Sequence, residues 1–161
     1  MIELGDNFPL SRYRHCYSVG KKMYAYAYNV LGWSDKKSKE MFVLGNLHDI
    51  GYEMNSDAFL HDDALANILD KKYKYSNEIR YHSYLQTKYK SPEMDLLYFA
   101  DMTVDGMGNW VTFEERMYDL ISRYGEQSEV VKASFDILNY LKSKGFNDRL
   151  DIYWVGENSG I

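Results

Sequence analysis

Hydrophobic positions in this chain recur at intervals of three and four residues, which predicts helices throughout and an all-α fold. The first helix is expected over residues 11–31. Gly32 ends it, because glycine commonly stops a helix. Ser34 then caps a second helix that ends near His48. The inward stripe of the first helix consists of His15, Val19, Met23, Tyr26 and Val30.

Three shorter helices are expected in the middle of the chain. One begins near His61 and aligns Leu65 with Ile68. The next covers residues 76–85 and places Ile79 beside His82. The third begins at Ser91 and Pro92, because proline suits the first turn of a helix. Its inward face consists of Met94, Leu97, Asp101 and Val104.

Two further helices are expected near the carboxyl end. The Thr112 to Glu115 segment has the form of a capping box that opens a helix to about residue 124. The last helix covers residues 128–144, ends at Gly145 and turns Val131, Phe135, Leu138 and Leu141 inward. An apolar segment at 150–155 is expected to dock on the bundle. We therefore expect one domain over residues 1–161, built as a bundle of six to seven helices. Its core covers about 11–125, and a carboxyl-terminal helix and docking tail cover 126–161.

Composition narrows the choice of partner. The net charge is −5 and the sequence pI about 5.4, so neither nucleic acid nor an anionic membrane is an expected partner. Because Cys16 is the single cysteine, no internal disulfide can form, which is typical of a cytoplasmic protein. The Cys16 side chain is predicted to pack in the core. The first ten residues lack the form of a secretory signal, and no stretch reaches the ~20 apolar residues of a membrane span.

Six potential metal ligands lie in register with apolar helical faces. Burying such groups is costly unless something satisfies them, and a metal ion does so. Asp49 follows His48 directly, and its two oxygens could bridge two cations ~3.5–4 Å apart. Such a centre would attract a phosphate and activate water as a nucleophile. The six residues are His15, His48, Asp49, His61, His82 and Asp101.

The order H…HD…H…H…D resembles the dinuclear branch of the HD-domain metal-dependent phosphohydrolase superfamily, over about residues 11–116. The resemblance implies an HD-domain bundle with two divalent transition metals (iron, manganese, cobalt or zinc), magnesium being a further candidate. By resemblance, the first metal would bind His15, His48, Asp49 and Asp101. The second would bind His61, His82 and Asp49, which acts as the bridging catalytic carboxylate.

The sequence departs from this pattern in one place. Many dinuclear members have a lysine three residues after the motif aspartate, where this chain has Tyr52. A phosphate contact must then come from elsewhere. Arginine pairs well with phosphate oxygens, so Arg12 and Arg80 are the preferred substrate-binding residues, ahead of Arg14 and Arg116.

Three further aspartates near the ligands have simple structural interpretations. Asp62 and Asp63 are interpreted as acids that favour the start of a helix, although they could also orient an imidazole. Asp105 either forms the turn with Gly106 or supports the ligands.

The resulting hypothesis is a cytoplasmic phosphohydrolase. It would act on a small phosphorylated substrate, a nucleotide-like ester or anhydride, through a dinuclear centre and metal-activated water. An HD-fold dinuclear iron oxygenase, a mononuclear nucleotidase and a non-catalytic nucleotide- or metal-binding domain remain alternatives. A homo-oligomer is compatible with the sequence.

Overall fold

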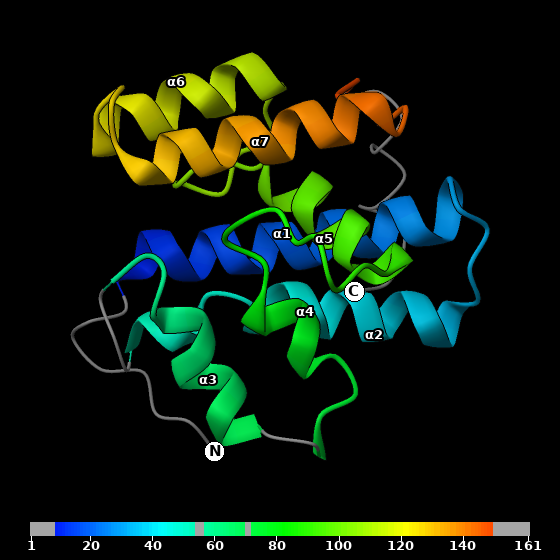
Figure 1. The fold of residues 1–161 in the computed structure, drawn as a ribbon. Helices are drawn as coiled ribbons and strands as arrows, with labels where there is room; N and C mark the ends of the chain where they lie inside the picture. The colour runs from blue at the N-terminus through cyan, green and yellow to red at the C-terminus, as the bar shows by residue number, and fades with distance from the viewer. Residues whose placement is uncertain (1–8, 54–56, 70–71, 150–161) are drawn as a thin grey trace.

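A computed structural model of the protein describes residues 9–53, 57–69 and 72–149, and within these ranges the fold is all-helical (Figure 1). Seven α-helices occur in this part of the chain, which confirms the predicted all-α class. The predicted tail at 150–155 lies outside the described residues. The elements are α1 (Leu10–Asn29), α2 (Asp35–Leu47), the 3₁₀-helix η1 (Ile50–Glu53), α3 (His61–Leu69), α4 (Ser76–Arg80), α5 (Pro92–Asp101), α6 (Phe113–Tyr124) and α7 (Glu129–Ser143).

Side-chain caps fix the starts of four helices. The hydroxyl of Ser34 accepts a hydrogen bond from the backbone of α2, and Ser91 and Ser128 do the same for α5 and α7. Thr112 and Glu115 form the predicted capping box of α6. These local signals explain why the predicted starts of these helices are accurate.

Helix α5 is the central element of the bundle. Its five consecutive residues from Leu96 to Ala100 are all buried, as expected for a helix that is covered on more than one side. In Figure 1, α1 and α2 lie on one side of it and the α6–α7 hairpin on the other. Leu97 packs into the cluster formed with α1 and α2, whereas Phe99 packs into the cluster formed with α6 and α7. The sequence had predicted a single inward face for this helix.

Three residues predicted to face inward are exposed instead. Val30 is 42% exposed because α1 ends at Asn29, one residue before it. Ile68 lies in the last turn of α3 and is 61% exposed. Phe135 is 43% exposed because the buried face of α7 runs through Ser134 and Ile137. Cys16 is buried as predicted, and burial raises the pKa of its thiol to about 12.

A tight contact joins η1 to the beginning of α3. A Cβ atom added to Gly51 would collide with the backbone carbonyl of His61, so only glycine fits here. This contact brings the segment after His48 against the first turn of α3. Among the described residues, no helix has the length and apolar character needed to cross a bilayer.

Candidate metal centre

Five of the six predicted ligands line one pocket, and the sixth, His48, lies against the pocket residue Asp49; the six come from five segments of the chain. His15 lies inside α1, whereas the other three histidines lie at helix ends. His48 caps the end of α2, His61 is the first residue of α3, and His82 follows the end of α4. All four histidines are at least 96% buried. The prediction that all four histidines are buried is therefore right, and His48 and His61 lie at the predicted helix ends, whereas His82 falls outside the helix predicted over 76–85.

Backbone carbonyls orient three of the imidazoles. His15 Nδ1 donates to the carbonyl of Asp105 at 2.8 Å. His48 Nδ1 donates to Gly45 and His82 Nδ1 to Ile79, both at 2.6 Å. The last carbonyls of a helix lack intrahelical partners, so these two acceptors are available at the ends of α2 and α4. Since a carbonyl oxygen only accepts, Nδ1 carries the proton in each ring, and the Nε2 lone pair is left to point into the pocket.

The first group of inward-facing atoms belongs to His15, His48 and Asp101. Asp101 Oδ1 lies 2.9 Å from Nε2 of His15 and 3.6 Å from Nε2 of His48. Among the described residues, His48 Nε2 is buried without a hydrogen-bond partner. A cation bound between His48 Nε2 and the Asp101 carboxylate would satisfy this unpaired nitrogen.

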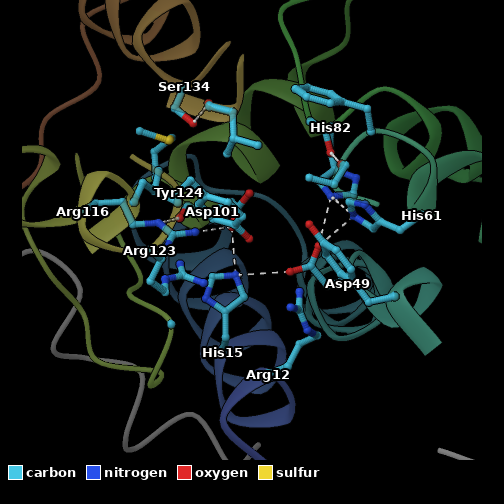
Figure 2. Close-up of a pocket in the computed structure, with 18 of the residues that line it drawn as sticks. Arg12, His15, Asp49, His61, His82, Asp101, Arg116, Arg123, Tyr124 and Ser134 are labelled. Atoms are coloured by element: carbon cyan, nitrogen blue, oxygen red, sulfur yellow. Dashed lines mark hydrogen bonds and ion pairs between the residues drawn. The ribbon is translucent and has the colours of Figure 1, made fainter. Parts of the chain in front are cut away.

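Asp49 lies between this group and a second one, as Figure 2 shows. Its Oδ2 atom is 3.7 Å from His15 Nε2 and 3.4 Å from His48 Nε2. Its Oδ1 atom is 3.1 Å from His61 Nε2 and 3.2 Å from His82 Nε2. Each oxygen of this carboxylate therefore faces a different pair of histidines.

The spacing of these atoms fits metal coordination. Bonds of about 2.0–2.2 Å to nitrogen or oxygen place neighbouring ligand atoms about 3.0–3.5 Å apart. The separations of 2.9–3.7 Å in the first group and 3.1–3.2 Å in the second lie around this range. The buried histidines and aspartates of this pocket could hold a metal ion.

The electrostatics of the pocket also favour a positive charge among these atoms. Burial alone would raise the pKa of Asp49, but the imidazoles around it hold that pKa well below its ordinary value. Asp101 behaves in the same way, through His15 and His48. Burial would lower the pKa of His61, but hydrogen bonds with Asp49 and Asp62 raise it to about 9. The carboxylates and imidazoles thus require protons or a metal ion between them.

Arg12 lines the pocket and stacks on the ring of Tyr52. Its guanidinium lies 3.6 Å above the centre of the Tyr52 ring, which stacks on His61 with ring centres 3.7 Å apart. The Nε atom of Arg12 is buried without a hydrogen-bond partner among the described residues. Tyr52 thus supports an arginine at the pocket. The sequence pattern did not predict this stacking role for Tyr52.

The other predicted arginines have different positions. Arg80 does not line the pocket, because it pairs with Asp63 at 2.7 Å and with Asn67 at 2.9 Å. Arg14 also lies outside the pocket lining. Arg116 lines it, donates to the carbonyl of Asp101 at 3.0 Å and approaches its Oδ1 atom at 3.3 Å. Arg123, which was not predicted, lines the same side of the pocket (Figure 2).

The α6–α7 hairpin adds an apolar wall to the pocket. Leu120 comes from α6, and Val130 and Ile137 come from α7. Tyr124 closes the same side at the end of α6. The pocket therefore combines a charged floor with an apolar side, the mixture typical of small-molecule sites.

Three aspartates beside the ligands have distinct surroundings. Asp62 is 1% exposed and its Oδ1 atom lies 2.6 Å from His61 Nε2, so the interpretation as a helix-start acid misses its inward position. Asp63 pairs with Arg80 outside the pocket. The Asp105 side chain forms the turn by accepting from the backbone of Met107 and Asn109, while its carbonyl orients His15.

Comparison with protein-family models, with curated proteins and with solved structures finds no match to this chain.

Proposed function

We propose that this protein is a metal-dependent phosphohydrolase of the dinuclear HD-domain type. One observation carries the proposal: the two oxygens of Asp49 face two separate histidine pairs, as a carboxylate that bridges two metals would. His15, His48 and Asp101 would hold the first metal together with Asp49. His61 and His82 would hold the second.

When bound, a pair of divalent metals would supply a Lewis acid for a phosphoryl oxygen and a water of lowered pKa. The protein's own residues prepare the pocket for this chemistry. The carbonyls of Gly45, Ile79 and Asp105 hold three imidazoles in the tautomer that presents Nε2.

The side chains around the centre favour a substrate with a phosphate and an apolar part. Arg12 and Arg123 place guanidinium groups at the pocket, and Arg116 places a third beside Asp101. The apolar wall formed by Leu120 and Ile137 would receive the rest of the molecule. A nucleotide-like ester or anhydride has both parts.

The direct test measures phosphate release from a panel of nucleotides and other phosphate esters, using protein loaded with Mn²⁺, Fe²⁺ or Co²⁺ under anaerobic conditions. Hydrolysis that Asp49→Ala abolishes would support the proposal. Turnover only with oxygen would indicate the iron oxygenase instead. Metal or nucleotide binding without turnover of the panel would favour a binding domain.

His61→Ala and His82→Ala distinguish one metal from two. Activity that survives both substitutions would favour a mononuclear nucleotidase, because both imidazoles face Asp49 Oδ1, the oxygen on the side of the second metal. Loss of activity in either variant, with the fold retained, would support the dinuclear centre.

A further inference from the structure

Asp62 is a buried carboxylate at the candidate centre to which neither the predicted ligand set nor the proposed function assigns a role. It is 1% exposed, although it lies in the first turn of α3, where acids are usually solvated. Its Oδ1 atom is 2.6 Å from Nε2 of His61 and 3.5 Å from Nε2 of His82. A charge this deeply buried requires a partner of opposite sign.

The position of Asp62 repeats that of Asp101 on the other side of Asp49. Asp101 Oδ1 stands 2.9 Å and 3.6 Å from the two Nε2 atoms of its own histidine pair, His15 and His48. The corresponding separations for Asp62 are nearly the same. We infer that Asp62 is a ligand of the second metal.

This assignment makes the two halves of the centre chemically equivalent. Each metal would have two imidazoles, one carboxylate of its own and one oxygen of the shared Asp49. His61, His82 and Asp62 have ligand atoms within 4.8 Å of one another, as do His15, His48 and Asp101. Without Asp62, the second metal would have only three protein ligands.

Ser83 holds the Asp62 carboxylate in place. Its hydroxyl donates to Oδ1 at 3.0 Å and its backbone N–H donates to Oδ2 at 3.3 Å. Ligating carboxylates are usually fixed by such hydrogen bonds. Since each carboxylate oxygen has two lone pairs, Oδ1 keeps one for a metal while it accepts from Ser83.

A third carboxylate also lowers the charge of the loaded centre. Three aspartates offset three of the four positive charges that two divalent metals bring, and neutral imidazoles add none. The metals alone then attract a phosphate less strongly. Arg12, Arg116 and Arg123 line the pocket and add positive charge to it, although Asp119 pairs with Arg116 and Arg123 and offsets one of the three charges.

The inference rests on the proposed dinuclear centre but does not depend on hydrolysis, so the test counts bound metals. Mn²⁺ is titrated into chelator-treated protein by calorimetry, and the spin-coupled and uncoupled ions are distinguished by electron paramagnetic resonance. Wild-type protein is expected to bind two ions per chain. Asp62→Ala is expected to keep one ion and to lose at least about 100-fold in affinity for the other, more than loss of a supporting group would cause.

Three further variants separate coordination from structural support. The Asp62→Asn side chain can still accept hydrogen bonds but lacks the negative charge, so this variant should also bind the second ion weakly. If Asp62→Ala does not fold, Asp62→Asn tests whether Asp62 is a ligand. Ser83→Ala removes the hydroxyl that supports the carboxylate and should retain two ions. Asp63→Ala is the matched control, because that neighbouring carboxylate pairs with Arg80 away from the pocket.

The outcomes separate this inference from the proposed function. Two ions with unchanged affinities in folded Asp62→Ala or Asp62→Asn would overturn the ligand assignment and leave the dinuclear centre standing. Fewer than two ions in the wild-type protein would overturn both.

Discussion

Gly45 of α2 lies directly against Gly20 of α1, since a Cβ atom added to Gly45 would stand 2.5 Å from the Cα atom of Gly20. The backbones of the two helices are therefore in contact at this point. The carbonyl of the same Gly45 accepts the hydrogen bond from His48 Nδ1. The packing of α1 on α2 and the orientation of a candidate metal ligand thus depend on one residue.

Gly45→Ala should push the two helices apart. We expect the free energy of unfolding to fall by about 1–3 kcal/mol, as in other overpacked cores, and the affinity for Mn²⁺ to fall because His48 moves. Urea denaturation and metal titration measure the two effects. Val43→Ala, at an exposed position of the same helix, is the control and should change neither. Unchanged stability in Gly45→Ala would contradict the observed contact.

The sequence was sufficient to predict the six candidate ligands, because the expected helices placed each of them in register with apolar residues. It was not sufficient to place His82. The helix predicted over 76–85 ends at Arg80, because the carbonyls of Tyr81 and Tyr84 accept hydrogen bonds from the Tyr98 hydroxyl of α5. These contacts with α5 hold the segment after Arg80 in a non-helical conformation, although the local sequence pattern predicts that the helix continues.

The arrangement around Asp62 shows a second limit of sequence analysis. An acid in the first turn of a helix normally needs no explanation beyond the helix dipole. The burial of Asp62 follows from contacts with Ser83 and His82, which lie 21 and 20 residues further along the chain. Only the folded chain reveals that Asp62 faces His61 and His82 while Asp63 faces Arg80.

Metal binding should stabilise the folded protein, because the ligands come from segments that are separate in the unfolded chain. At a free Mn²⁺ concentration of 100 times Kd, the gain is about 2.7 kcal/mol, which raises Tm by about 5–10 °C for a domain of this size. Differential scanning calorimetry with and without Mn²⁺ measures the shift. His48→Ala should lose most of it, and an equal shift in that variant would argue against binding at this pocket.

Arg12 should contribute to phosphate affinity more than Arg80 does. Arg12→Ala is expected to weaken the binding of inorganic phosphate to the metal-loaded protein about tenfold, because a charge-assisted hydrogen bond is lost. Arg12→Lys should restore only part of the affinity, since lysine keeps the charge but not the planar group that stacks on Tyr52. Calorimetry gives the affinities. Arg80→Ala is the control, and equal affinities in Arg12→Ala and wild type would remove Arg12 from the substrate site.

Lys22 should make stability depend on pH in the alkaline range. This lysine is fully buried, donates to the carbonyl of Thr103 at 3.1 Å and lies near the rings of Phe99 and Trp110. Burial lowers its pKa from 10.5 to about 7. Between these two values the unfolded chain binds a proton that the folded chain does not, so stability rises as the pH increases from about 7 to 10.5. The full contribution is at most about 5 kcal/mol.

Lys22→Met isolates this effect, because methionine fills a similar volume without a charge. Denaturant unfolding of both proteins should be measured from pH 6 to pH 10.5, so that other titrating groups cancel in the difference. Relative to wild type, the variant should be most stabilised near pH 6, where the buried ammonium must stay protonated, and its advantage should shrink as the pH rises. A difference that stays constant over this range would mean that Lys22 remains charged in the folded protein, with Thr103 and the two rings compensating for its burial.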